Sequence, residues 1–153
     1  MQKIASFQIN HDKLEKGMYI SRIDGDVVTY DIRMKKPNDG EFLHMSAAHT
    51  LEHLLATYLR GSEIGGSVIY VGPMGCRTGF YILLRDSVSY VKAIENVKAA
   101  MAFARDYTGE IPGNKREECG NYLDHDLLGA KKEAMEMCDV LKNWKEKDLE
   151  YRL

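Results

Sequence analysis

Four short segments of the chain combine apolar and β-branched residues and are bounded by turn residues. Such residues favour strands, and clusters of Gly, Pro and Asp between them mark turns. The pattern predicts strands over residues 18–23, 27–34, 67–71 and 79–84. Asp24-Gly25-Asp26 separates the first two, and we expect it to close a β-hairpin. Gly72-Pro73-Met74-Gly75 separates the last two and predicts a second turn.

Three other segments repeat apolar residues at the spacing of a helix. The periodicity predicts helices over residues 45–60, over residues 87–107 and from about residue 126 to residue 151. Ser46 is a favourable N-cap for the first helix, and Gly61 is a favourable residue to end it. Together the elements predict an α+β fold in which an antiparallel sheet packs against helices.

The helix predicted over residues 45–60 contains His49-Thr50-Leu51-Glu52-His53, an H-x-x-E-H pattern. Histidines four residues apart lie on one face of a helix, and Glu52 projects beside that face. Two neutral imidazoles bind a divalent metal, and a nearby carboxylate moves protons. The opposite face is apolar and is predicted to pack on the core through Leu51, Leu54, Leu55 and Tyr58. The alternative is a helix with two ordinary histidines and a solvated glutamate.

A catalytic metal site usually has three protein ligands and one open position. Cys119, just ahead of the last predicted helix, is the best candidate for a third ligand, and His125 is another. The alternative for Cys119 is a small buried thiol. Cys76 follows the glycine-rich turn, and its neighbour Arg77 would favour a thiolate if it points toward the sulfur. The alternative for Cys76 is a structural cysteine at a strand end.

Composition narrows the class of protein. The chain has 153 residues, which predicts one domain, and 44% of them are hydrophobic, enough to form a core. The net charge of −2 comes from 21 basic and 23 acidic residues spread along the chain, so we expect no nucleic-acid partner. No apolar run is long enough for a signal peptide core or a membrane span. Three cysteines without C-x-x-C spacing favour a cytoplasmic protein with free thiols.

Five blocks of the sequence, in the same order, resemble the S-ribosylhomocysteine lyase family, the autoinducer-2 synthases. The resemblance covers nearly the whole chain, and a chance match of all five blocks is very unlikely. The blocks are Ser6-Phe7 with Asn10-His11, Asp31-Ile32-Arg33 with Pro37-Asn38, the segment from His49 to Ala56, the segment from Pro73 to Tyr81, and Cys119-Gly120 with His125-Asp126-Leu127.

The resemblance implies a role for eight residues. These are the metal ligands His49, His53 and Cys119, the acid–base pair Glu52 and Cys76, and the substrate-binding residues Ser6, His11 and Arg33. It also implies a two-layer α+β sandwich that forms a homodimer, with active sites at the subunit interface and one divalent metal per subunit. The metal is expected to be iron(II), which zinc or cobalt can replace. Asn10 and Tyr70 depart from the family, which commonly has aspartates there.

The reaction that the resemblance implies cleaves the thioether of S-ribosylhomocysteine to homocysteine and 4,5-dihydroxy-2,3-pentanedione, the autoinducer-2 precursor. Two other functions remain open from the residues. One is a small zinc metallopeptidase, because H-x-x-E-H also occurs in inverted zinc peptidases. The other is a non-catalytic metal-binding module, which a closed fourth position with His125 as a ligand would favour.

Overall fold

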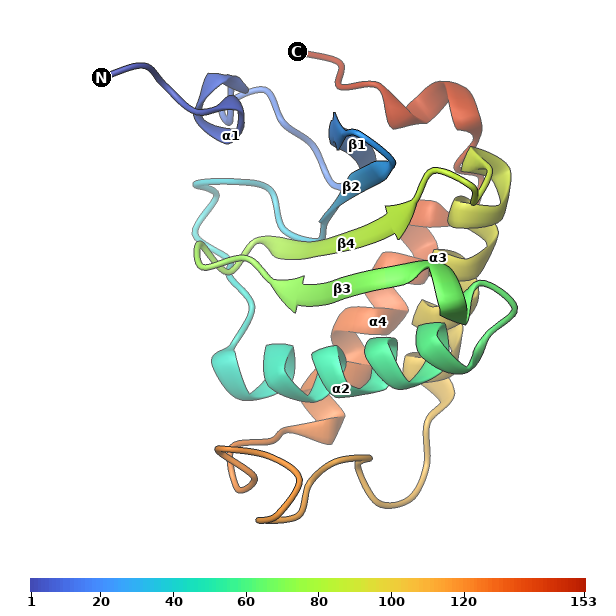
Figure 1. Cartoon of the computed structure of the whole chain (residues 1–153). Coiled ribbons are helices and arrows are strands. Elements are labelled where there is room, and N and C mark those ends of the chain that lie inside the picture. Colours follow the sequence, from blue (N-terminus) through green and yellow to red (C-terminus); the bar gives the residue numbers. More distant parts are fainter.

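The computed structural model describes all residues, 1–153, and contains one antiparallel sheet of four strands. The strands lie in the order β1-β2-β4-β3 (Figure 1). Their bounds are Gly17–Asp24 for β1, Val27–Arg33 for β2, Val68–Pro73 for β3 and Gly79–Arg85 for β4. The four predicted strands and the β1–β2 hairpin are confirmed, with small shifts at the ends.

Three long helices cover one face of this sheet and contact one another (Figure 1). They are α2 (Met45–Gly61), α3 (Tyr90–Asp106) and α4 (Leu127–Leu141). Shorter turns of helix are α1 (Ala5–Gln8), η1 (Gly65–Ser67) and η2 (Glu146–Leu149). The α+β prediction of a sheet layer against a helix layer is therefore confirmed. None of the helices has both the length and the apolar composition needed to cross a membrane.

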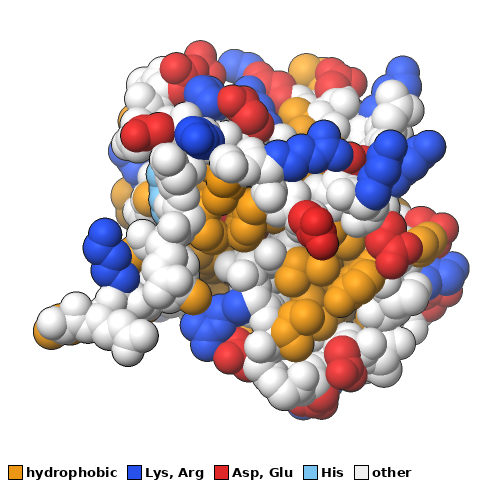
Figure 2. All heavy atoms as spheres, turned by 90° about the horizontal axis from the view of Figure 1, so that it is seen from above, with side chains coloured by type: hydrophobic (Ala, Val, Ile, Leu, Met, Phe, Trp, Pro, Cys, Tyr) orange, Lys and Arg blue, Asp and Glu red, His pale blue; other side chains and the backbone are white.

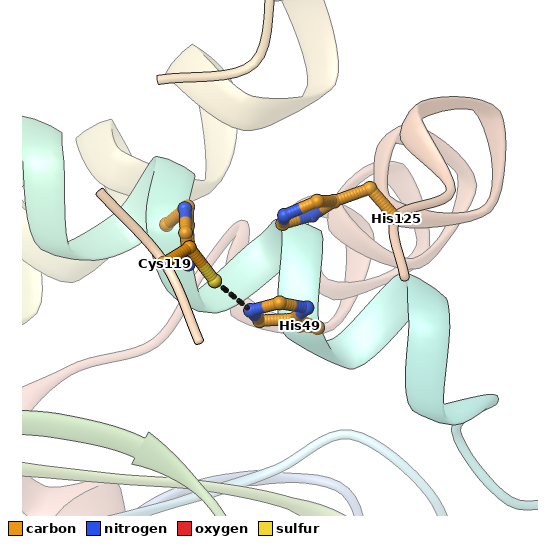
Figure 3. A group of neighbouring side chains, drawn as sticks. His49, Cys119 and His125 are labelled. Carbon is orange, nitrogen blue, oxygen red and sulfur yellow. Dashed lines mark hydrogen bonds between the residues drawn. The ribbon is translucent and has the colours of Figure 1, made fainter. Parts of the chain in front are cut away.

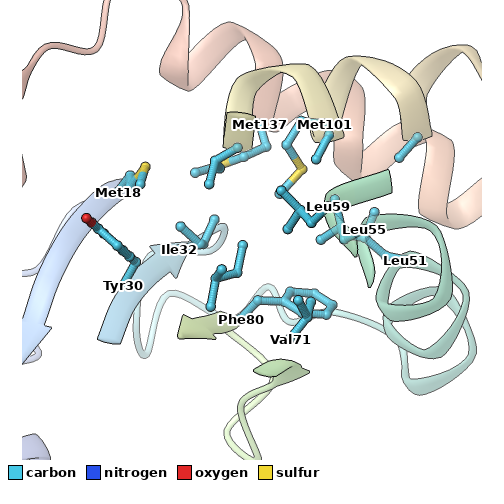
Figure 4. Packing of buried hydrophobic residues seen from close by; sticks show 14 of the residues in the cluster. Met18, Tyr30, Ile32, Leu51, Leu55, Leu59, Val71, Phe80, Met101 and Met137 are labelled. Atoms are coloured by element: carbon cyan, nitrogen blue, oxygen red, sulfur yellow. The ribbon is translucent and has the colours of Figure 1, made fainter. Parts of the chain in front are cut away.

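The hydrophobic core lies between the two layers and contains 29 buried residues (Figure 4). Phe80, Ile82 and Leu84 alternate along β4, so all three side chains point to this face and are fully buried. From α2, Leu51 and Leu55 enter the same core (Figure 4). The apolar face predicted for α2 is thus confirmed, and it turns the opposite face of the helix away from the core.

The helix predicted from about residue 126 to residue 151 is wrong in its second half. α4 ends at Leu141, and the chain continues through a turn into η2. Trp144 causes the break, because its Nε1 donates to the carbonyl oxygen of Met18 at 2.8 Å. The Trp144 ring also lies so close to Gly17 that a Cβ there would come within 2.3 Å of it. The C-terminal segment therefore leaves the helix in order to pack against β1.

The predicted N-cap of α2 is also wrong. The residue at this position is His44, whose side chain makes no capping hydrogen bond, and Ser46 lies inside the first turn. The Ser46 hydroxyl instead donates to Asp124 Oδ1 at 2.6 Å. The helix start is thereby tied to the segment between α3 and α4.

The Tyr30 side chain is buried in the core, and its hydroxyl has no hydrogen-bond partner (Figure 4). A substitution at this position therefore tests how the unpaired hydroxyl affects stability. Burial raises the pKa of the phenol, so the group stays neutral, yet its desolvation is not compensated by a hydrogen bond. We expect Tyr30→Phe to increase the free energy of unfolding by about 1 kcal/mol, because it removes the unpaired group and keeps the ring. Guanidinium unfolding at one fixed protein concentration measures the change.

Tyr19→Phe is the matched control for this prediction. The Tyr19 hydroxyl donates to the carbonyl oxygen of Glu15 at 3.0 Å, so its removal should lower the free energy of unfolding by about 1 kcal/mol. If Tyr30→Phe destabilises the protein as much as Tyr19→Phe, the Tyr30 hydroxyl has a partner in solution and the prediction is wrong.

Candidate metal centre

His49 and His53 lie one turn apart on the face of α2 that points away from the core. Both side chains are half-buried, and their ring centroids are 4.7 Å apart. The ring planes are nearly perpendicular, at 89°. Two imidazoles with crossing planes are able to direct one nitrogen each at a common point. The sequence prediction of a histidine pair on one helix face is therefore confirmed in its geometry.

Backbone carbonyls fix the tautomer of both histidines. His49 Nδ1 lies 2.7 Å from the carbonyl oxygen of Asp124, and His53 Nδ1 lies 2.7 Å from that of Pro112. A carbonyl only accepts, so each Nδ1 carries the proton and each Nε2 keeps a free lone pair. Gly113 makes the second contact possible. Its φ is +73°, and a Cβ there would come within 3.0 Å of His53 Nδ1.

Cys119 comes from the long segment between α3 and α4, which also supplies Pro112 and Asp124. Its Sγ lies 3.4 Å from His49 Nε2 (Figure 3). In a tetrahedral site, neighbouring nitrogen and sulfur ligands are about 3.6 Å apart, close to this distance. The backbone N–H of Asn121 donates to the same sulfur at 3.5 Å. The structure thus brings the predicted third ligand beside the histidine pair.

His125 joins the same group from the residue just before the N-cap of α4 (Figure 3). Its Nδ1 lies 2.9 Å from Thr50 Oγ1, and its Nε2 is buried without a partner. Its ring stacks on His49, with centroids 4.1 Å apart and planes at 18°. Burial, followed by repulsion from His49 and His53, lowers the pKa of His125 and favours the neutral imidazole.

The donor set fits a transition metal. His49, His53, Cys119 and His125 each offer one donor atom, and these atoms all lie within 4.8 Å of one another. Imidazole nitrogen and thiolate sulfur suit zinc, iron and cobalt, whereas magnesium and calcium prefer oxygen ligands. The carbonyl contacts of His49 and His53 match the outer-sphere hydrogen bonds that orient histidine ligands in metal sites. This group is therefore able to bind a metal.

A cavity of about 530 Å³ opens beside the metal centre. Glu52 lines it from α2, next to His49. The turn between β3 and β4 forms the facing wall with Pro73, Met74, Gly75 and Arg77. Arg77 has a positive φ of 61°, a conformation that is uncommon outside glycine and occurs where the backbone is held in place. The cavity is large enough for a small substrate beside the carboxylate.

Cys76 lies on the same turn, and its thiol is exposed. The condition for Arg77 to favour a thiolate is not met, because the Arg77 guanidinium lies over the Phe42 ring at 5.6 Å. The polar neighbour of the thiol is Thr78, whose Oγ1 lies 3.1 Å from Cys76 Sγ. Thr78 was not identified from the sequence, although its position two residues after Cys76 places it within reach.

Arg33 is buried on the outer face of β2, where it forms an ion pair with Asp31. Its Nη2 lies 2.6 Å from Asp31 Oδ2, and its Nη1 donates to Thr78 Oγ1 at 2.7 Å. Tyr151 donates to the same Asp31 oxygen at 2.7 Å. The Thr78 oxygen accepts from Arg33, so its own proton is free to point at Cys76 Sγ. A continuous polar chain thus connects the C-terminal segment to the thiol.

Ser6 and His11 do not reach the metal centre within one chain. Ser6 lies in α1 and His11 just after it, at the opposite end of the molecule from α2 (Figure 1). Neither residue lines the cavity beside His49. The nearby Asn10 accepts from the backbone N–H of Asp12 at 3.0 Å. Tyr70, the other departure from the family, is half-exposed on β3 and covers Gly72.

Comparison with known proteins gives a consistent result. The family model described as S-Ribosylhomocysteinase (LuxS) matches residues 4–148. S-ribosylhomocysteine lyase from Desulfotalea psychrophila is 43% identical over 157 positions, covering 99% of both chains. The proteins of that name from Clostridium acetobutylicum and Porphyromonas gingivalis are 42% and 43% identical, with the same coverage. On the strength of these matches and the site described above, the chain belongs to the S-ribosylhomocysteinase family.

Proposed function

We propose that the chain is an S-ribosylhomocysteine lyase, which cleaves its substrate to homocysteine and 4,5-dihydroxy-2,3-pentanedione. The observation that carries this proposal is the family match over residues 4–148, within which the His–Cys cluster and the cavity both lie. The reaction consumes no water and needs no external oxidant. The carbonyl moves from C1 to C2 to C3, and loss of the C4 proton then expels the thiolate from C5.

We propose that His49, His53 and Cys119 hold one divalent transition metal per subunit. Two observations support this ligand set. Backbone carbonyls leave Nε2 of His49 and of His53 unprotonated, and Cys119 Sγ lies 3.4 Å from His49 Nε2. When bound, the metal polarises a substrate carbonyl as a Lewis acid and makes the neighbouring C–H more acidic. Iron(II) is the metal expected from the family, with zinc or cobalt as replacements.

The carbon-bound protons require a base on each side of the substrate, and Glu52 and Cys76 fit this need. Glu52 enters the cavity from α2, and Cys76 lies on the turn that forms the facing wall. Arg33 is only 2% exposed, with its nitrogens engaged by Asp31 and Thr78. Arg33 is predicted from the resemblance to bind substrate, and these contacts support a further role in which it acts through Thr78 to orient a hydrogen bond at the Cys76 sulfur. The predicted substrate contacts of Ser6 and His11 need a second subunit.

We propose a homodimer in which α1 of one subunit reaches the cavity of the other. α1 has no buried residue, and the apolar side chains of Ile4 and Phe7 are exposed. Figure 2 shows an arm of chain extending from the body on the side where Figure 1 places the N-terminus. The same face has groups of exposed apolar side chains (Figure 2). An apolar arm and apolar surface together are typical of an interface between subunits.

Subunit mixing tests this arrangement. A Ser6→Ala/His11→Ala double variant and a Glu52→Gln variant should each be almost inactive. In a mixed dimer one site receives the intact arm and the intact Glu52, so equal mixing should restore about a quarter of wild-type activity in a two-fold symmetric dimer. Subunit exchange is followed by mass spectrometry with one differently tagged variant. Complete exchange without recovered activity would exclude sites shared across the interface.

The two other interpretations are not favoured. An inverted zinc peptidase resembles the chain only in the five residues from His49 to His53, whereas the family match covers nearly all of it. A metal-binding module without catalysis needs a closed coordination sphere. A cavity beside His49 and Glu52 argues against that interpretation.

The function is tested directly by incubating the metal-loaded protein with S-ribosylhomocysteine and titrating the released thiol. Homocysteine and the dione should appear in equal amounts, because one bond cleavage forms both. Release of thiol without the dione, or no release by the loaded protein, would contradict the proposed function.

A further inference from the structure

Asp31, Arg33 and Thr78 form a buried polar group on the face of the sheet that points away from the helices. Their exposed fractions are 0%, 2% and 3%. The strand register pairs Arg33 with Gly79, so Thr78 follows directly beside the end of β2. Two backbone N–H groups from the chain after β2 donate to the carbonyl oxygen of Thr78, at 2.8 and 2.9 Å. The position of Thr78 is therefore held by the backbone and does not depend on its side chain.

In this group chemistry decides which atom donates in each hydrogen bond but the last. Tyr151 donates to Asp31 Oδ2 at 2.7 Å, because a carboxylate only accepts. Arg33 donates to both Asp31 oxygens, at 3.0 and 2.6 Å, and its Nη1 donates to Thr78 Oγ1 at 2.7 Å. Thr78 Oγ1 lies 3.1 Å from Cys76 Sγ, and either atom is able to donate while the sulfur is a thiol. A thiolate has no proton, so in that state the Thr78 hydroxyl donates to it.

Tyr151 is the anchored end of this series of contacts. Its ring stacks on Tyr19, with centroids 4.9 Å apart, and Tyr19 packs edge-on against Trp144 at 5.7 Å. η2 precedes it and contacts β1, with Leu149 only 1% exposed (Figure 1). Burial, followed by the negative charge of Asp31, raises the pKa of Tyr151, so the phenol stays protonated and remains a donor. The C-terminal segment thus presents a fixed hydroxyl to the buried group.

We propose that Tyr151 is a positioning residue for the Cys76 thiolate, acting through the buried Asp31, Arg33 and Thr78. The inference rests on the proposed function for the role of Cys76 as a base. The Tyr151 hydroxyl holds one Asp31 oxygen, and the carboxylate then fixes the plane of the Arg33 guanidinium through two parallel hydrogen bonds. That plane directs Nη1 at the Thr78 oxygen, which leaves the hydroxyl proton for the sulfur.

Alkylation of Cys76 by iodoacetamide at neutral pH tests the proposal, because the thiolate is the nucleophile. Peptide mass spectrometry of the zinc-loaded protein gives the rate at each cysteine separately. Thr78→Val should react about fivefold more slowly, since it loses a hydrogen bond to a charged group, and the greater nucleophilicity of the remaining thiolate offsets part of that loss.

Tyr151→Phe keeps the ring and removes only the hydroxyl. Its Cys76 should react about threefold more slowly, a modest coupling within one hydrogen-bond network. The double variant Tyr151→Phe/Thr78→Val should react no more slowly than Thr78→Val alone, because Tyr151 acts through Thr78. Thr78→Ser retains the hydroxyl and should restore the wild-type rate.

Two controls separate positioning from a general loosening of the fold. Tyr19→Phe removes a hydroxyl from the same aromatic stack, where it donates to the Glu15 carbonyl oxygen, and should leave the alkylation of Cys76 unchanged. Cys138 is a half-buried free thiol on α4, and its rate in the same samples should not change.

A wild-type rate at Cys76 in Tyr151→Phe would overturn the proposal, even if Thr78→Val does not fold. Multiplied losses in the double variant would also overturn it, and so would an equal loss in Tyr19→Phe or a parallel change at Cys138. The alkylation rates do not depend on turnover. Failure of thiol release would contradict the proposed function and leave these rates as they are.

Discussion

His53→Ala and Cys119→Ala are each expected to leave the purified protein almost without metal and to reduce kcat/KM by about 10³-fold. Each removes one of three proposed ligands, and two donors form a weak site for a divalent ion. The Lewis-acid contribution of a bound metal is several kcal/mol of barrier, which corresponds to a loss of this size. Elemental analysis together with thiol release measures both effects on the same samples.

His125→Ala is the matched control for these two variants. His125 lies in the same cluster and offers a donor atom within 4.8 Å of the others, yet its ring stacks on His49. His125→Ala should therefore retain metal under conditions in which His53→Ala and Cys119→Ala lose it. Full metal occupancy in both His53→Ala and Cys119→Ala would rule out the proposed ligand set.

The sequence predicts the elements that depend on local pattern. The leucine spacing of α2 sets the buried face, and the same helix geometry then places His49 and His53 together on the other side. For the site, this local information is sufficient because the two histidines and Glu52 share one helix. Cys119 is a candidate from its place ahead of the last predicted helix, the resemblance to a family favours it over a buried thiol, and the 3.4 Å contact between its sulfur and His49 agrees with that placement.

Contacts between distant segments explain what the sequence does not predict. Helical spacing continues past Leu141, but α4 ends there because Trp144 bonds to Met18, 126 residues away in sequence. Ser46 has the chemistry of an N-cap and is instead bound to Asp124, 78 residues away. In both cases the local sequence favours one structure, and a hydrogen bond to a distant segment imposes another.

The sequence contains a partial signal for the polar chain that leads from Tyr151 through Asp31, Arg33 and Thr78 to Cys76. Asp31 and Arg33 are two residues apart on a strand, so they lie on one face, and this spacing signals an ion pair. Their burial on the outer face of the sheet follows from the C-terminal Tyr151, which covers them and donates to Asp31. No local pattern predicts that contact across 120 residues.

Cys76→Ala and Glu52→Gln should both keep their metal and fold, and each should reduce product formation by about 10²- to 10⁴-fold. Neither residue is among the three proposed ligands, so metal content should stay at the wild-type level. Both are proposed to transfer carbon-bound protons, and loss of a positioned acid–base group has an effect of this size. Cys138→Ala is the matched control, because Cys138 is a free thiol packed against the core and should tolerate the change.

The two variants should differ in the step at which the reaction stops. Glu52 lines the cavity from α2, and Cys76 lies on the facing turn between Gly75 and Arg77, which line it, so we expect the two residues to reach different substrate protons. In heavy water, a variant with one remaining base should still exchange some substrate protons for deuterium, at different carbons in Cys76→Ala and in Glu52→Gln. NMR of the recovered S-ribosylhomocysteine identifies those carbons. Homocysteine release by Cys76→Ala at nearly the wild-type rate, or loss of its metal, would contradict the assignment. Exchange at the same carbons in both variants would show that one base serves every proton transfer before the thioether breaks.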